Sequence, residues 1–207
     1  MNAKEHWESV YRSKQPTDVS WYQVQPSLSL DLIARAGLRP TDGIIDVGGG
    51  ASVLVDRLLD AGYENLAVLD ISGAALAHAQ ERLGARAQCV EWYEADVREF
   101  SPPHRYALWH DRAVFHFLTG ADDRAHYVQT LKRTLRSGGS AVIATFAADG
   151  PKRCSGLDVV RHDAASVRAA LGPGFSLVKE TREVHVTPWQ TEQHFAYFRF
   201  TWNGGAA

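Results

Sequence analysis

Apolar residues recur along the middle of the chain with two alternating spacings. Short apolar runs of the kind that forms buried strands occur over residues 43–47, 66–70, 87–90, 106–110 and 140–146. Between them, apolar residues recur every three or four positions, as on the buried face of a helix, over residues 53–61, 72–83 and 122–135. Strands that alternate with helices in this way predict a parallel sheet covered by helices on both faces.

The two ends of the chain show other patterns. Residues 3–12 predict a short helix, and Pro26 begins a second one. A further helix over residues 163–171 precedes two segments rich in β-branched and aromatic residues, which cover residues 175–186 and 194–202. A turn-like connection joins these two segments, so they predict an antiparallel hairpin.

The predicted elements fit a single domain, because 207 residues are enough for one well-filled core and too few for two. No internal repeat or low-complexity linker interrupts the chain. We expect three consecutive parts: a helical arm over residues 1–40, an α/β core over residues 41–147, and a closing segment over residues 148–207 with a loop, a helix and the hairpin.

Charge and cysteine content narrow the class of protein. The 22 basic and 24 acidic residues give a net charge of −2 without a run of either sign, which argues against a nucleic-acid-binding stripe. Cys89 and Cys154 form no C-x-x-C pair, so a reducing compartment is favoured over a disulfide or zinc framework. No run approaches the ~18 apolar residues of a membrane span. We expect a cytoplasmic protein, monomeric or homodimeric, without nucleic-acid or membrane partners.

A glycine loop follows the first strand of the core and reads Asp46, Val47, Gly48, Gly49, Gly50. Glycines at such a position let the backbone turn tightly and approach a ligand closely. The helix that follows presents free amide groups to polar ligand atoms. Ligands of open α/β sheets bind along the edge formed by the carboxyl ends of the strands, so we predict a ligand site here.

Polar residues follow the neighbouring strands at the same edge. Asp70 ends the second strand, where a carboxylate is suited to accept hydrogen bonds from the two hydroxyls of a ribose. Asp96 and Val97 follow the third strand, where a carboxylate and a backbone amide can contact an adenine. His110 and Asp111 end the fourth strand beside the glycine loop. The pattern favours a nucleoside ligand over the alternative of a plain glycine turn next to a surface aspartate.

A dinucleotide is the main alternative ligand, because its fingerprint is G-x-G-x-x-G after a strand. Gly48 and Gly50 fit this fingerprint, but Val53 occupies the position of the third glycine. Asp46 would repel a pyrophosphate, whereas it suits the ammonium group of a methionine moiety. A dinucleotide fold also needs a second βαβ half, where this sequence predicts a hairpin.

The pieces IIDVGGGAS, AVLDIS, EADV and ALWHDRAVFHFL, within residues 43–147, resemble the S-adenosylmethionine-binding core of class I methyltransferases. The resemblance implies a Rossmann-like α/β sheet of strand order 3-2-1-4-5-7-6, with the hairpin as its last two strands. It also implies S-adenosylmethionine as the cofactor. By position, Gly48 and Gly50 face its methionine part, Asp70 its ribose, and residues 71 and 96–97 its adenine.

The residues expected to contact the cofactor lie at the carboxyl edge of the predicted sheet or in the arm beside it. They are Trp21, Asp46, Gly48, Gly49, Gly50, Asp70, Ile71, Asp96, Val97, His110 and Asp111. Trp21 and Tyr22 either close over the cofactor or anchor the arm to the core. Residues 146–157 follow the fifth strand at the same edge, and their glycines and Pro151 disfavour a helix, so we predict a substrate-covering loop.

Methyl transfer from a sulfonium is an in-line displacement, so the main tasks of the protein are alignment and exclusion of water. A base is needed only when the nucleophile arrives protonated. His116 is the candidate base, because the pKa of an unperturbed histidine lies near cellular pH; the alternative is a histidine that packs against the neighbouring helix. The spacing of His110, Asp111 and His116 matches no closed set of metal ligands, so no metal is expected.

The N-terminal stretch HWESVYRSKQPTDVSWYQ resembles a subgroup that includes protein-lysine methyltransferases acting on a translation elongation factor. That subgroup usually has an acid–Lys–Gly run after the fourth strand, whereas this chain has Asp111, Arg112 and Ala113 there. The difference argues against a lysine substrate. The short chain favours a small-molecule methyl acceptor; a protein-lysine acceptor and a non-enzymatic cofactor-binding role are the alternatives.

Overall fold

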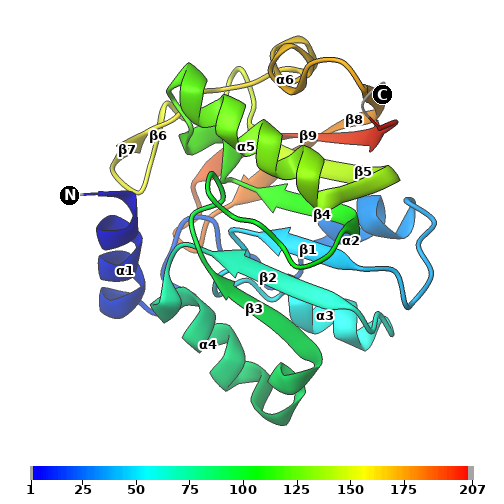
Figure 1. Cartoon of the computed structure of the whole chain (residues 1–207). Helices are drawn as coiled ribbons and strands as arrows, with labels where there is room; N and C mark the ends of the chain where they lie inside the picture. Colours follow the sequence, from blue (N-terminus) through cyan, green and yellow to red (C-terminus); the bar gives the residue numbers. More distant parts are fainter. Residues whose placement is uncertain (1, 205–207) are drawn as a thin grey trace.

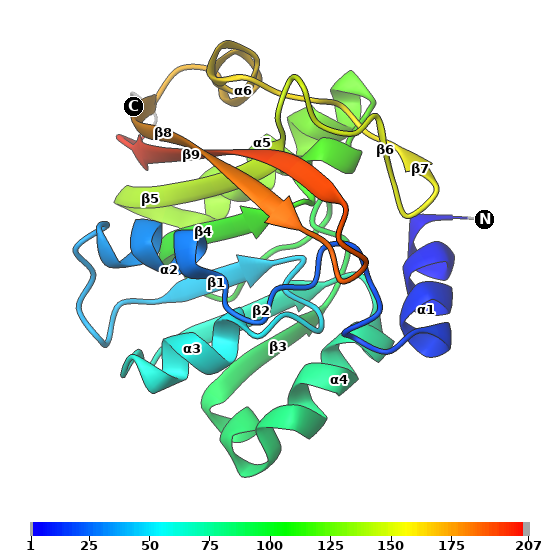
Figure 2. The same ribbon diagram turned by 180° about the vertical axis from the view of Figure 1, so that it is seen from behind.

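The computed structural model describes residues 2–204 and contains a seven-stranded sheet between two layers of helices (Figures 1 and 2). The strands are β1 (Ile44–Val47), β2 (Leu66–Asp70), β3 (Val90–Glu94), β4 (Tyr106–Arg112), β5 (Leu135–Phe146), β6 (Arg153–Cys154), β7 (Leu157–Asp158), β8 (Phe175–Val186) and β9 (Glu192–Trp202). Their order in the sheet is β3-β2-β1-β4-β5-β9-β8, and β9 runs antiparallel to both of its neighbours, β5 and β8, whereas the other neighbouring strands are parallel. This confirms the predicted order, because β8 and β9 are the predicted hairpin and the short pair β6–β7 lies outside the sheet.

The helices cover the two faces unequally. They are α1 (Ala3–Ser13), α2 (Ser27–Ala34), α3 (Leu54–Asp60), α4 (Gly73–Leu83), α5 (Ala121–Thr134) and α6 (Ala164–Leu171), with short 3-10 helices at Gly84–Cys89 and Phe115–Phe117. Helices α2, α3 and α4 lie on one face, and α5 and α6 lie on the other (Figures 1 and 2). Helix α1 packs beside α4. Within residues 2–204, no helix is both long and apolar enough to cross a membrane.

Each face of the sheet has its own apolar cluster. One contains Leu58 of α3 and Leu76 of α4, and the other contains Leu131 of α5 and Leu171 of α6. The central strand β1 contributes to both clusters, and all four of its residues are buried. Burial on both faces explains why β1 reads as a near-continuous apolar run. The one polar residue in that run, Asp46, therefore needs partners in the structure.

The helix ends carry the expected capping residues. The backbone N–H of Ala75 donates to the side chain of Ser72 at the start of α4, and Gly84 follows its last turn with φ 56°. Asp163 caps α6 in the same way. These caps place the first turn of α4 directly after β2, so the free amides of α4 lie at the carboxyl edge of the sheet.

Three predicted boundaries were wrong. The third strand spans Val90–Glu94, because residues 84–89 form a 3-10 helix and the strand that follows lies half-buried at the sheet edge, without an apolar run. The fifth strand begins at Leu135, directly after α5, rather than at Ser140. The segment 146–157 contains the antiparallel strand pair β6–β7 in addition to loop.

Candidate active site

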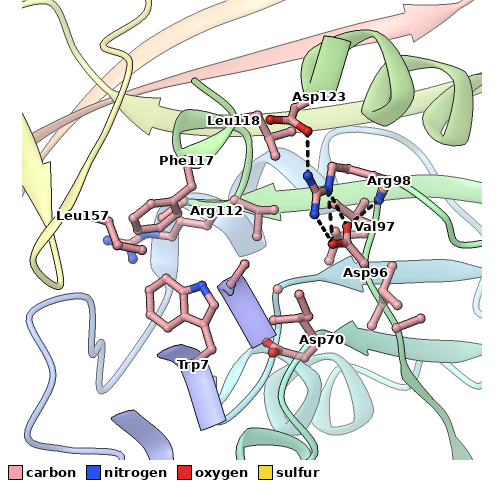
Figure 3. A pocket seen from close by; sticks show the side chains of 18 of the residues that line it. Trp7, Asp70, Asp96, Val97, Arg98, Arg112, Phe117, Leu118, Asp123 and Leu157 are labelled. Carbon is pink, nitrogen blue, oxygen red and sulfur yellow. Dashed lines mark hydrogen bonds and ion pairs between the residues drawn. The ribbon is translucent and has the colours of Figure 1, made fainter. Parts of the chain in front are cut away.

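A cavity of about 280 Å³ opens at the carboxyl edge of the sheet (Figure 3). Its walls come from the glycine loop, the ends of β2 and β4, the loop after β3, helix α1 and the β6–β7 turn. A smaller cavity of about 60 Å³ adjoins it, since Gly48, Trp21 and Arg112 line both. The predicted edge of the sheet is therefore hollowed where a ligand site was expected.

The glycine loop needs glycine at two of its positions. Gly48 has φ +68°, and a Cβ there would overlap the side chain of Val114. Gly50 has φ +37°, and a Cβ there would lie 2.7 Å from a carboxylate oxygen of Asp70. Residues with a side chain rarely adopt these backbone conformations, so the loop combines a left-handed turn with close packing against the cavity wall.

Asp70 lies at the end of β2 against the cavity and is buried. Its side chain accepts a hydrogen bond from the backbone N–H of Ser72 at 2.9 Å. Burial raises the pKa of Asp70 to about 7, in spite of that hydrogen bond, and the negative charge of Asp46 adds to the shift. Hydrogen bonds from the hydroxyl groups of a ligand, such as a ribose, would stabilise the ionised form of this carboxylate.

Asp46 is held by a chain of side chains across β1 and β4. Asp46 and His110 are register partners on these parallel strands, and Nδ1 of His110 lies 2.7 Å from the Asp46 carboxylate. A carboxylate can only accept, so Nδ1 of His110 carries a proton, and Nε2 lies within hydrogen-bond distance, 2.9 Å, of the Ser29 hydroxyl oxygen. His110, predicted as a cofactor contact, lines the smaller cavity and orients Asp46.

Asp96 lies on the cavity wall in a network that the sequence did not indicate. Both of its carboxylate oxygens accept from Arg98, and Arg98 also donates to Asp123 at 2.6 Å (Figure 3). Partial burial alone would raise the pKa of Asp96, but the hydrogen bonds from Arg98 hold it below its ordinary value. Ile71 and Val97 form the apolar part of the same wall. The expected adenine residues are thus brought together.

Helix α1 covers the cavity and was not predicted to do so. Trp7 and Tyr11 line the cavity from this helix. Glu8 fixes the helix in place, because its carboxylate accepts from the hydroxyl of Ser72 at 2.6 Å and from the backbone N–H of Ala74 at 2.9 Å. Glu8 therefore supplies an acid at the N-terminus of α4, where the helix dipole favours negative charge.

Three predicted site residues, Gly50, Asp111 and His116, lie outside the lining of both cavities, and Gly50 packs against Asp70. Asp111 is fully buried and accepts from the Tyr127 hydroxyl at 2.6 Å and from the amides of Val114 and Phe115. It therefore holds the turn after β4. His116 is also fully buried, and its Nδ1 accepts from the amide of Phe146 at 3.3 Å. Asp111 and His116 therefore do not face either cavity as a ligand contact or a base would.

The environment of His116 leads to a pH-dependent stability. Burial lowers the pKa of His116 to about 3 and that of His162 to about 4. Both rings stay neutral in the fold but protonate in the unfolded chain below about pH 6.5. The free energy of unfolding should therefore fall as the pH is lowered from 6.5 towards 4, by up to about 1.4 kcal/mol per unit for each ring. Denaturant unfolding across this range should show a smaller slope in H116Q; an equal slope would contradict the assignment.

The remaining predicted residues line one or both cavities. Trp21 lines both cavities, and its ring N–H donates to the Tyr11 hydroxyl at 3.1 Å, so it contacts the site and also anchors the arm. Gly49 lines the smaller cavity, next to Asp46. The loop after β5 contributes Cys154 and Leu157 to the larger cavity.

The comparison with protein families decides the class of this domain. Residues 44–139 match the model of a family described as a methyltransferase domain. This segment of the chain is similar to a methyltransferase domain. The match runs from β1 to the middle of β5 and so includes the glycine loop, Asp70 and the Asp96 wall of the site.

Curated relatives match parts of this chain at low identity. The "eEF1A lysine and N-terminal methyltransferase" of Danio rerio is 24% identical over 150 residues, which cover 70% of this chain and 21% of the relative. The protein of the same name from Mus musculus is 25% identical over 99 residues, covering 48% of this chain and 14% of the relative. The chain therefore spans about a fifth or less of the length of these curated relatives.

Solved structures resemble the methyltransferase domain over nearly all of its length. A structure from work on the conversion of a disulfide bond into a thioacetal group during echinomycin biosynthesis has a TM-score of 0.78 at 18% identity, and covers 100% of this chain and 94% of that chain. The N-methyltransferase NodS of Bradyrhizobium japonicum, in complex with S-adenosylhomocysteine, has a TM-score of 0.69 at 17% identity and covers 94% and 97%. At these identities the likeness shows the class I fold.

Proposed function

We propose that this protein is an S-adenosylmethionine-dependent methyltransferase that acts on an N, O or S atom of a small molecule. The observation that carries the proposal is Asp70: a buried carboxylate with a raised pKa, in van der Waals reach of the glycine loop and open to the cavity. The ribose hydroxyls of the cofactor would donate further hydrogen bonds to this carboxylate. Asp96, Ile71 and Val97 would hold the adenine, and the loop beside Asp46 would hold the methionine part.

The cavity also supports a small acceptor. When bound, the cofactor supplies an electrophilic methyl group, and the protein aligns the acceptor and excludes water. Helix α1 closes one side of the cavity through Trp7, and the β6–β7 turn closes another through Leu157. Among the structural neighbours, NodS and the glycopeptide enzyme MtfA are named as N-methyltransferases. A cytoplasmic location and a monomeric or homodimeric state stay predictions from the sequence.

Protein-lysine methylation is the second candidate, because the curated relatives are named for it. Incubation of the protein with methyl-labelled S-adenosylmethionine and cell extract separates the two functions. We expect label in the low-mass fraction and none in a protein band. Label in a protein band alone would favour the second candidate, and the absence of any transfer together with tight S-adenosylhomocysteine binding would favour a non-enzymatic role.

A further inference from the structure

The end of the cavity away from Asp70 and Asp96 is lined by aromatic and aliphatic side chains. Figure 3 shows Trp7, Phe117 and Leu157 facing one another on that side. Trp7 makes edge contacts with Phe117 and with Trp21, with ring centroids 5.1 and 5.6 Å apart. If the proposed function is correct, the nucleoside occupies the acidic side and the acceptor lies against this aromatic wall. The inference below rests on that function.

The titratable groups among the described residues lining the cavity offer no free base at this aromatic end. They are Tyr11, Asp70, Asp96, Arg98, Arg112, Asp123 and Cys154. Asp96 and Asp123 are paired with Arg98, and Asp70 lies at the ribose side.

The two weak acids at the aromatic end stay protonated at neutral pH. Burial raises the pKa of Cys154 to about 11. Burial also raises the pKa of the Tyr11 hydroxyl, which accepts from Trp21. Neither group can take a proton from an alcohol or an alkyl ammonium at neutral pH. The acceptor atom must therefore reach the site with a lone pair already available.

Arg112 brings a positive charge to this end of the cavity. Its guanidinium donates to the Tyr197 hydroxyl at 2.8 Å and to the carbonyl of Trp21 at 3.1 Å, and it lies over the ring of Phe195 at 4.3 Å. Its acidic partner Glu183 is 3.4 Å away but does not line the cavity. Arg112 therefore belongs to the cavity wall, whereas its acidic partner is outside the lining.

The charge of Arg112 distinguishes between acceptors that need no base. The other titratable groups packed around it are Tyr197, His185, His116 and Cys154. Burial lowers the pKa of His116 and His185, so these rings are neutral and add no second charge at neutral pH. An anionic acceptor is stabilised by the guanidinium, whereas an ammonium, or a sulfonium formed from a thioether, is repelled. Among anionic acceptors, a carboxylate is strongly hydrated and a weak nucleophile, whereas a thiolate is the reactive form of a polarisable sulfur and suits a wall of aromatic side chains.

We propose that the methyl acceptor is a small apolar thiol, methylated on sulfur in its thiolate form. The thiol proton leaves to solvent before transfer. The thiolate sulfur then forms a bond to the methyl carbon, the bond from that carbon to the sulfonium breaks, and its electron pair stays on the departing sulfur. The products are a neutral thioether and S-adenosylhomocysteine. Trp7, Trp21 and Phe117 hold the apolar body of the thiol, and Arg112 stabilises its charge.

Three acceptors of one shape test this proposal on the wild-type chain: benzenethiol, phenol and aniline, each with saturating S-adenosylmethionine and a control without enzyme. We expect kcat/KM for the thiol to exceed that for phenol and for aniline by at least about 100-fold at neutral pH. With phenylmethanethiol, a weaker acid, the pH profile should move to higher pH. A preference for phenol or aniline, no methylation of either thiol, or a profile fixed by the enzyme would overturn the proposal.

Two variants test the role of Arg112. At saturating cofactor, R112M should lower kcat/KM for benzenethiol about tenfold and move its pH profile upward, whereas R112K should keep the position of the profile. An unmoved profile in R112M would contradict the charge assignment. Calorimetry with S-adenosylhomocysteine on each protein distinguishes a failure of the proposed function from a failure of the thiol inference alone. If wild type fails to bind it, the proposed function fails; if it binds and the label in cell extract enters an N- or O-methyl product, only the thiol inference fails.

Discussion

Replacement of Asp70 by alanine is expected to weaken S-adenosylhomocysteine binding by about 1–3 kcal/mol, which corresponds to roughly five- to 150-fold in Kd. The variant loses a buried carboxylate that would accept from the ribose hydroxyls, while Asp46 and the Asp96 wall are unchanged. Calorimetric titration measures the loss. The thermal midpoint of the unliganded protein should change little, because the carboxylate faces the cavity. Collapse of the unliganded fold without a selective binding defect would make Asp70 structural.

The raised pKa of Asp70 gives the same prediction a pH signature. Burial places this pKa at about 7 in the unliganded protein, and hydroxyl donors favour the ionised carboxylate. Affinity should therefore fall as the pH is lowered from 8 to 5, by up to about tenfold per unit below pH 7. D70N is the matched control, since it keeps the shape and cannot ionise. Its weaker binding should be flat over this range, and a pH dependence equal to that of wild type would assign the titration to another group.

Replacement of Gly48 by alanine is expected to have the largest effect on the site. The backbone at φ +68° costs a side chain about 1 kcal/mol, and overlap with Val114 adds about 1–3 kcal/mol of overpacking. The loop must shift to relieve both, so we expect at least about a hundredfold loss of S-adenosylhomocysteine affinity and a lower thermal midpoint. Calorimetry and thermal unfolding measure the two effects.

Gly37 provides the control for backbone strain alone. Its φ of +70° matches that of Gly48, and a Cβ there would meet nothing within 4 Å. G37A should lower stability by about 1 kcal/mol and leave cofactor affinity unchanged. If G48A and G37A behave alike in both measurements, the close approach to Val114 has no role in shaping the site.

The predicted site residues that line the cavities could be recognised from short-range signals. The glycine loop and Asp70 each follow a buried strand directly, and a parallel sheet brings such strand ends to one edge. The alternation of strands and helices predicted a parallel sheet closed by the aromatic hairpin β8–β9, whereas the order of the strands came from the resemblance to class I methyltransferases. The boundary of β3 was missed because an edge strand with half-buried residues lacks the apolar run that marks β1.

The residues that were missed reach the site through tertiary packing. Trp7 lines the cavity only because Glu8 attaches α1 to the start of α4, more than sixty positions away. Nothing in the local sequence around these residues indicates that contact. His116 and Asp111 are the opposite case. They follow β4 as a site residue would, but the chain turns them inward, where they bind Phe146 and Tyr127.

The central claim is that the carboxyl edge of this sheet binds S-adenosylmethionine and its product rather than a dinucleotide. Calorimetric titration of the wild-type chain at pH 8 with S-adenosylhomocysteine, and separately with NAD, tests it most directly. The account predicts saturable binding of S-adenosylhomocysteine at micromolar concentration or below, and no binding of NAD. Micromolar binding of NAD without a response to S-adenosylhomocysteine would contradict it.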